Sequence, residues 1–144
     1  MREILFRAKR IDNGEWVEGY YGIKGKGTDI ENHYIMVPTF QSSIGNYDYM
    51  CYFTDVHIDS ETLCQYTGLK DKNGKRIWEN DIVGAWSEGK HTIGRVKRRV
   101  DGLYIIYPSY QKQEFWGLCP DENGKTTVEV IGNIFDNPEL LKGE

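Results

Sequence analysis

The chain alternates short runs of β-forming residues with pairs of turn residues, and this pattern predicts a fold class that is mainly β. Four dipeptides, Asn13-Gly14, Asn73-Gly74, Asp101-Gly102 and Asn123-Gly124, tolerate positive φ at both of their positions. Each of them, flanked by β-forming residues, predicts a β-hairpin with a type I′ turn. The expected strands are rich in Tyr, Val, Ile, Thr, Phe and Trp. They are Ile4–Lys9, Trp16–Tyr21, Tyr34–Val37, Tyr49–Ile58, Asp81–Trp86, Ile93–Val100, Leu103–Tyr107, Glu114–Gly117 and Thr127–Ile134.

Helical periodicity is nearly missing from the chain. No window repeats apolar residues at i, i+3, i+4 and i+7 over three turns. Near the end, Asn137 suits an N-cap and Pro138 suits the first helical position, so Glu139–Lys142 is expected to form one short helical turn that lays its leucines on the sheet. Two polar stretches that contain glycine, Lys24–Asn32 and Gln41–Asn46, are expected to be loops.

The composition is that of an ordinary globular protein. The 144 residues are 39% hydrophobic and 28% charged, which suits one domain with its own core. No apolar run is long enough to span a membrane, and the first residues do not resemble a signal peptide, so a cytoplasmic location is expected. Cys51, Cys64 and Cys119 are odd in number and irregularly spaced, which favours reduced thiols over a disulfide framework.

Charge is distributed unevenly along the chain. The formal net charge is −4, but residues 51–100 carry 9 basic and 7 acidic groups, whereas residues 101–144 carry 3 and 8. A field that attracts nucleic acid to the whole protein is therefore excluded. Only a local basic patch would provide such an attraction.

Three segments resemble one known family. The run Gln65–Val83 is similar to the central signature of the YopX family of phage and prophage proteins, while Arg2–Lys9 and Glu129–Leu141 resemble the start and the closing motif of that family. Asn80 departs from the pattern, which usually has Gly there. Asn tolerates positive φ better than most residues, so the turn is expected to survive. The resemblance implies a gene carried by phages or prophages, and it implies neither an activity nor a set of site residues.

The order of elements predicts an architecture. Five short strands follow Trp78 and lead into the helical turn, an order that resembles a small SH3-like barrel, and additional β-hairpins precede it. Closing a barrel removes exposed strand edges. A single YopX-like domain is therefore expected over residues 1–144, divisible into N-terminal hairpins over 1–66 and the barrel over 67–144.

A basic stretch is the candidate nucleic-acid site. Arg95, Lys97 and Arg99 alternate in a run without acids, so a strand there would place them on one face and Val96 and Val100 on the other. Tyr104, Tyr107 and Tyr110 follow and would offer stacking surfaces. The alternative is a solvated outer face or the rim of a protein interface, which the negative net charge and the small footprint favour.

Two further residue patterns give weaker indications of a binding site. Asp55, His57, Asp59 and Glu61 alternate and would share one strand face, but side chains spaced about 7 Å apart in a line do not surround one metal ion, so an exposed polar face is the better interpretation. The stretch Gly22–Thr28 superficially resembles a phosphate loop, yet it lacks the Lys directly after the last Gly and the following helix.

These patterns lead to a functional expectation. No Gly-x-Ser-x-Gly nucleophile elbow is present, and His33, His57 and His91 are scattered, so nucleophilic catalysis has little support. We expect a non-enzymatic binding or scaffolding protein without a cofactor or a bound metal. Its partner would be another protein or a second copy of itself, and a nucleic-acid-binding module that uses Arg95, Lys97 and Arg99 is the alternative.

Overall fold

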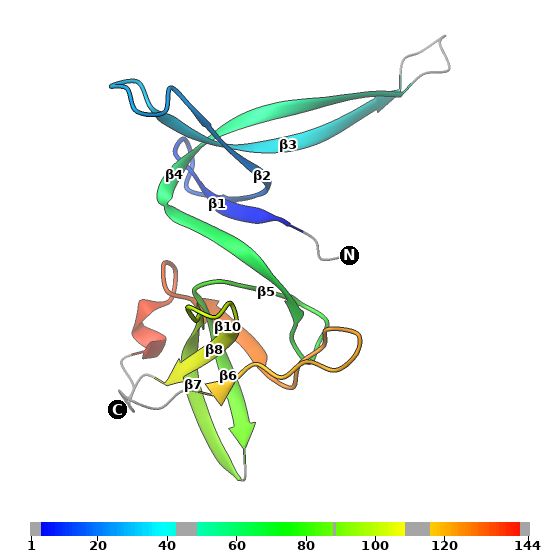
Figure 1. Ribbon diagram of the computed structural model, residues 1–144, viewed down its shortest axis with the longest axis vertical. Helices are drawn as coiled ribbons and strands as arrows, with labels where there is room; N and C mark the ends of the chain where they lie inside the picture. Colours follow the sequence, from blue (N-terminus) through cyan, green and yellow to red (C-terminus); the bar gives the residue numbers. More distant parts are fainter. Residues whose placement is uncertain (1–3, 43–48, 88, 109–115, 142–144) are drawn as a thin grey trace. The chain divides into compact units, whose positions relative to one another are not determined.

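The protein consists of strands, as the turn pattern predicts. The computed structural model describes residues 4–42, 49–87, 89–108 and 116–141 (Figure 1). In these ranges ten strands and one short 3-10 helix are present, and no helix is long and apolar enough to cross a membrane. The elements are β1 (Phe6–Arg10), β2 (Trp16–Lys24), β3 (Asn32–Ser42), β4 (Tyr49–Lys70), β5 (Arg76–Trp78), β6 (Asp81–Ser87), β7 (Lys90–Arg98), β8 (Tyr104–Pro108), β9 (Trp116–Gly117), β10 (Glu129–Asn133) and the 3-10 helix η1 (Pro138–Leu141).

The chain forms two compact units, residues 4–65 and residues 66–141, and it passes from one to the other within β4. In the N-terminal unit the antiparallel pairings run from β1 to β2, β3 and β4, and β4 pairs back with β1. The core of this unit is formed by Ala8, Ile35 and Ile58, with Phe6, Val17, Tyr21, Val37 and Leu63 packed against it.

The C-terminal unit contains a second antiparallel sheet in the order β10-β6-β7-β8-β9. Its core is apolar and consists of Ile77, Val83, Ala85, Val96, Tyr104, Ile106, Leu118 and Val128. Helix η1 lies against β7, as expected for the short C-terminal turn. Among the described residues no pairing joins β9 to β10, so the pairings give an open sheet, and the closed SH3-like barrel stays a prediction.

The turns lie where the dipeptides place them, but their predicted type is wrong. Type I′ needs positive φ at both central residues. Gly14, Gly74, Gly102 and Gly124 have φ of 73°, 83°, 90° and 80°, yet Asn80 has the one positive φ among the described non-glycine residues. At Asn73-Gly74 the Gly74 amide donates to Asp71 O (3.0 Å), and Asp71 N donates to Lys75 O (2.8 Å). These bonds define a three-residue loop, in which a type I turn ends in a left-handed glycine.

The reason for the different turn type is a side chain before the dipeptide. Asp71 Oδ1 accepts hydrogen bonds from Asn73 N and Lys75 N, both at 2.9 Å, and so holds Asn73 in a right-handed conformation. Asp121 does the same for Asn123 N (2.8 Å) and Lys125 N (3.0 Å). By contrast, the expected positive φ at Asn80 is confirmed, at 70°.

Candidate binding surfaces

Two of the three cations of the predicted basic site, Arg95 and Lys97, lie on one face of β7, in different environments. Arg95 and Lys97 alternate with Val96, which is fully buried. Arg95 is half-buried, and its Nη2 donates to Asn80 Oδ1 at 2.8 Å. Lys97 is exposed, and its Nζ lies 5.3 Å from the centre of the Tyr107 ring.

Arg99 follows the end of β7 and belongs to the turn into β8. Its Nε lies 3.7 Å from Asp101 Oδ2. Because the strand ends at Arg98, Val100 is fully exposed and does not face the core, contrary to expectation. Tyr104 is 7% exposed and belongs to the core, so it offers no stacking surface, and Tyr110 lies outside the described residues. Lys97 and Arg99 are both exposed, and Lys97 beside Tyr107 is the part of the predicted site that combines an exposed cation with an aromatic ring.

The acidic line on β4 is a set of separate local contacts. Asp55 Oδ2 pairs with Lys24 Nζ at 2.6 Å, and the ring of His57 stacks on Tyr34 with a centre distance of 5.2 Å. Asp59 Oδ1 accepts from the Glu61 amide at 3.1 Å. Over the described ranges no three His, Cys, Asp or Glu side chains are grouped as ligands of one metal ion.

The glycine-rich stretch forms the turn between β2 and β3. Gly25 and Gly27 have φ of 70° and 81°, and a strand follows them instead of the helix that a phosphate loop needs. The Gly27 amide donates to Glu31 Oε2 at 2.9 Å. That hydrogen bond lowers the pKa of the Glu31 carboxyl below its ordinary value.

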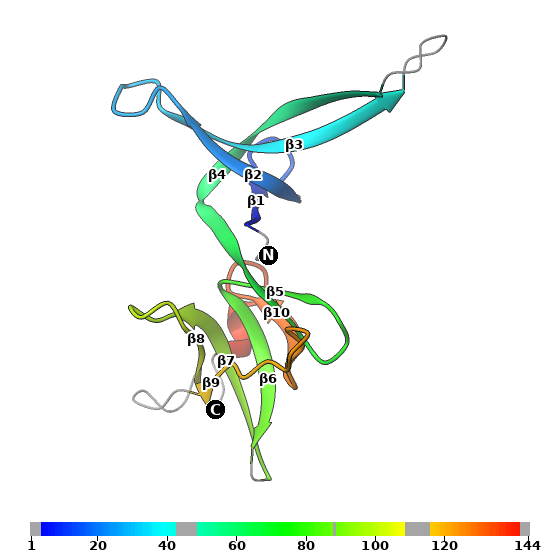
Figure 2. The same cartoon turned by 45° about the vertical axis from the view of Figure 1, so that its right-hand side comes forward.

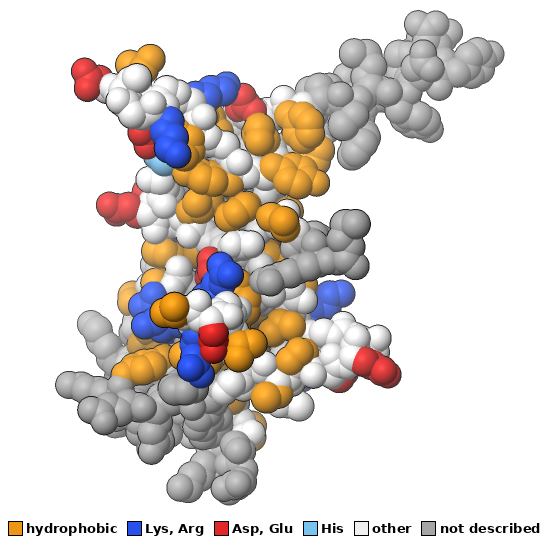
Figure 3. All heavy atoms as spheres, viewed as in Figure 1, with side chains coloured by type: hydrophobic (Ala, Val, Ile, Leu, Met, Phe, Trp, Pro, Cys, Tyr) orange, Lys and Arg blue, Asp and Glu red, His pale blue; other side chains and the backbone are white. Residues whose placement is uncertain are grey.

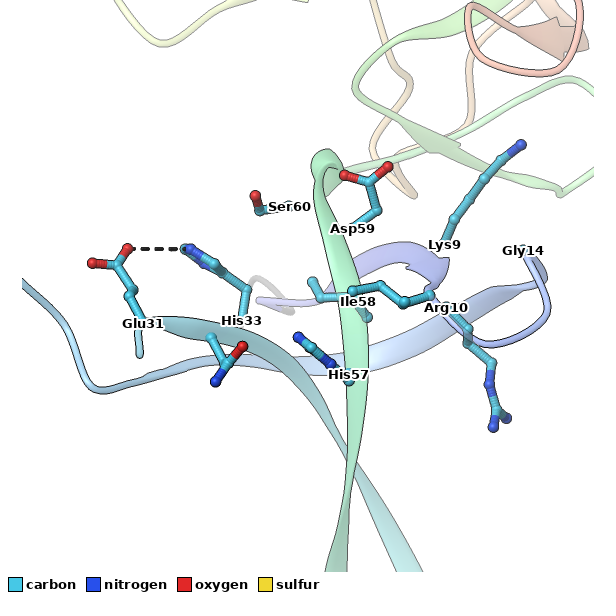
Figure 4. Close-up of a pocket in the computed structure, with 11 residues that line it drawn as sticks. Lys9, Arg10, Gly14, Glu31, His33, His57, Ile58, Asp59 and Ser60 are labelled. Atoms are coloured by element: carbon cyan, nitrogen blue, oxygen red, sulfur yellow. Dashed lines mark ion pairs between the residues drawn. The ribbon is translucent and has the colours of Figure 1, made fainter. Parts of the chain in front are cut away.

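A polar cleft of about 450 Å³ lies in the N-terminal unit, between the β1–β2 turn, the start of β3 and the middle of β4. It is lined by Lys9, Arg10, Ile11, Gly14, Glu31, Asn32, His33, His57, Ile58, Asp59 and Ser60. Figure 4 shows His33 turned toward Glu31, and its Nε2 lies 3.2 Å from Glu31 Oε1. The opposite ring nitrogen, Nδ1, lies 2.5 Å from the hydroxyl of Tyr21.

The chain of contacts from Tyr21 through His33 to Glu31 has the connectivity of a nucleophile, a base and an orienting acid. Its electrostatics oppose that function. Burial, and then the nearby Glu31 carboxylate, raise the pKa of the Tyr21 phenol above its ordinary value, so the hydroxyl stays protonated. An activated nucleophile needs the opposite shift. The network therefore ties the β2–β3 turn to the sheet, and sequence reasoning missed it because Tyr21 and His33 are twelve positions apart.

The outer face of the same sheet carries an exposed apolar cluster. Tyr20 and Phe53 are 48% and 55% exposed, and their rings meet edge to face with centres 6.2 Å apart. Met36 and Pro38 of β3 lie beside them, because Tyr20 is paired with Met36 and Phe53 with Pro38. We call Tyr20, Met36, Pro38 and Phe53 the outer cluster. Figure 3 shows hydrophobic side chains gathered over β3 and β4.

The outer cluster is a candidate binding surface that sequence reasoning did not identify. Exposed apolar groups that lie together mark interaction sites more often than single exposed residues do. The alternation of Tyr34, Met36 and Pro38 along one strand was a visible signal, but only the register shows that Tyr20 and Phe53 share their face.

Comparisons with known proteins agree with this fold. A family model described as YopX protein matches residues 5–142. The crystal structure of protein EF1440 from Enterococcus faecalis is similar over 98% of this chain and 99% of that chain, with 21% identity and a TM-score of 0.52. At that identity the likeness concerns the fold alone. No curated protein matches this chain.

Proposed function

Since the chain belongs to the YopX protein family, we propose that it acts as a non-enzymatic binding or scaffolding module, an accessory protein of phages or prophages in the cytoplasm of the bacterial host. The observation that carries the proposal is the outer cluster. Two aromatic rings that are about half exposed and in mutual contact keep an apolar surface in water unless a partner covers it. The proposal includes an SH3-like barrel for the C-terminal unit, which the strand order β10-β6-β7-β8-β9 supports.

Site-specific photocrosslinking in bacterial cells tests the binding function. A photoreactive phenylalanine analogue at position 53 should give a discrete protein adduct, because Phe53 is 55% exposed and its ring meets that of Tyr20 in the outer cluster. The matched control carries the analogue at Leu103, an exposed apolar residue outside the cluster, and should give none. Adducts at neither position, or the same adducts at both, would reject the outer cluster as a binding surface.

Nucleic-acid binding is the second candidate, and the position of Lys97 over the Tyr107 ring favours it. A cation beside an aromatic ring on one face of a sheet, here on the neighbouring strands β7 and β8, is the combination that single-stranded nucleic acids bind. The opposing observations are the bond from Arg95 to Asn80 and the nearness of Asp101 to Arg99. The candidate site is therefore small.

The salt dependence of binding to single-stranded DNA and to RNA tests this candidate. Replacing Arg95, Lys97 and Arg99 with Gln should reduce the slope of log K against log salt by about two, at about 0.7 per lost phosphate contact. The control replaces Lys72, Lys75 and Lys125, three exposed lysines of the same unit, and should leave the slope unchanged. If the native chain binds neither nucleic acid at low salt, this second candidate is excluded.

A further inference from the structure

Strands β3 and β4 continue beyond β2 as a two-stranded ribbon, visible in Figures 1 and 2. The pairing of β2 with β3 ends at Tyr20 and Met36, whereas β3 and β4 remain paired from Val37 and Thr54 to Ser42 and Tyr49. A ribbon of only two strands is marginally stable in water, and a third strand or a packed layer stabilises it. The ribbon therefore has room for an additional strand.

The two edges of the ribbon differ in their capacity to accept that strand. The edge of β4 opposite β3 pairs with β1 from Ile58 onward, and the Ile11 amide donates to His57 O at 3.1 Å. Over the described residues, no strand pairs with this edge between Tyr49 and Val56. The edge of β3 contains Pro38, which has no N–H and so interrupts a ladder. The edge of β4 is the better acceptor.

The β4 strand of the ribbon lacks, from Tyr49 to Thr54, the features that keep strand edges apart. Natural edge strands carry charged residues, especially Lys, or Pro, which prevent pairing with other chains. From Tyr34 to Thr54 the chain has a single charged residue, Asp48, and Tyr49–Thr54 reads Tyr-Met-Cys-Tyr-Phe-Thr, without charge or Pro. Such an unprotected β-forming edge pairs readily with another strand.

We propose that the edge of β4 opposite β3, from Tyr49 to Val56, pairs antiparallel with the same edge of a second copy of this chain. A two-fold axis perpendicular to the strand places it antiparallel to its own copy, so one edge supplies both sides of the interface. Charge also favours this position. Residues 4–65 carry five Lys or Arg and nine Asp or Glu, so two copies repel each other elsewhere on this unit and meet best at Tyr49–Thr54, which carries no charge. The one acid of the proposed edge, Asp55, is paired with Lys24.

A notch at the end of this edge of β4 supports the same arrangement. It has a volume of about 240 Å³ and lies between the residues Arg10–Asp12 and the β4 residues Thr54–His57. Ile11 is 56% exposed and lines this notch, at the point where β1 stops pairing with β4. The end of the added strand fits here, and it would cover Ile11. This inference rests on the proposed function, because it names the partner of the binding module.

Mass and amide exchange together test the inference. Light scattering of the full chain should give twice the mass of one chain at high micromolar concentration. On dilution to a monomer, the amides of Tyr49–Val56 should exchange faster, while those of Phe6–Arg10 should not change. Phe53→Lys should be monomeric and folded, because a charge on the edge strand opposes pairing. Leu103→Lys, with the same change of charge outside the ribbon, should remain dimeric.

Two results would overturn the inference without touching the proposed function. One is a native chain that is monomeric at every concentration while position 53 still crosslinks to another protein. The other is a dimer in which dilution leaves exchange in Tyr49–Val56 unchanged. If crosslinking at position 53 also fails, the proposed function falls with it.

Discussion

At the scale of single residues, two copies of one turn sequence have different roles. Asp71 and Asp121 each begin a run of Asp-x-Asn-Gly-Lys, and each carboxylate accepts two backbone amides of its own turn. The Asp71 carboxylate is buried, with the residue 1% exposed, and it also accepts the Val130 amide at 3.1 Å. Asp121 is exposed. The same local sequence thus forms an internal anchor in one place and a surface turn in the other.

The first prediction compares these two aspartates. Asp71→Asn should lower the free energy of unfolding by about 1–3 kcal/mol, because an amide NH2 replaces an oxygen and leaves buried hydrogen-bonding groups without partners. Asp121→Asn makes the same chemical change at the surface and should cost less than about 0.5 kcal/mol. Urea unfolding of both variants measures the difference. Equal losses of unfolding free energy in the two variants would show that neither the Val130 hydrogen bond nor the burial of Asp71 contributes to stability.

At the scale of elements, close approach of backbones limits what β7 accepts. A Cβ built on Gly94 would lie 2.5 Å from Tyr107 O and 2.6 Å from Ile106 Cγ2, both on the neighbouring strand β8. Glycine inside a strand often marks such an approach. The β6–β7–β8 layer that presents Lys97 therefore depends on a residue without a side chain.

The second prediction follows from this contact. Gly94→Ala should destabilise the protein by about 1–3 kcal/mol, since β7 and β8 must shift apart to admit the methyl group. Gly117→Ala is the matched control, because the nearest atom to its Cβ would be Cys119 Sγ at 4.0 Å. Thermal unfolding compares the two variants. The described packing would be contradicted if Gly94→Ala left the unfolding temperature unchanged while Gly117→Ala lowered it.

At the scale of the whole molecule, the two units have separate cores. Ala8, Ile35 and Ile58 belong to residues 4–65, whereas Val96, Ile106 and their neighbours belong to residues 66–141. Ile35 and Ile106 are 0% and 1% exposed, so each is enclosed by its own unit. Removing either side chain creates a cavity in that unit alone.

The third prediction uses one core substitution in each unit of the full chain. Ile35→Ala and Ile106→Ala should each cost about 2–5 kcal/mol. Amide exchange should accelerate mainly in residues 4–65 for the first variant and mainly in residues 66–141 for the second, because local stability follows the damaged core. Leu103→Ala, at an exposed position, should leave both patterns unchanged. Uniform acceleration throughout the chain would indicate one cooperative core instead of two.

Local backbone preference made part of this structure readable from the sequence. Four correct predictions depend on residues within a few positions of each other. They are the places of the four Gly-containing turns, the positive φ of Asn80, the excess of strands over helix and the short helix near Pro138. The family resemblance rests on contiguous motifs of the same kind, and the match over residues 5–142 confirms it. The predicted site of Arg95, Lys97 and Arg99 stays a prediction.

Pairing between distant segments decided the rest. The turn at Asn73 is an exception, because its type follows from the carboxylate of Asp71 only two positions earlier. The bond of that carboxylate to Val130, 59 positions away, depends on the tertiary structure. The short strand β5 escaped prediction because it forms by pairing with the end of β4. Three further features arise only when the strands pair in one register. They are the half-burial of Arg95, the contact of Tyr21 with His33, and the outer cluster that contains Phe53. A register shift of one residue would turn these side chains to the opposite face, and no single segment of the sequence specifies that choice.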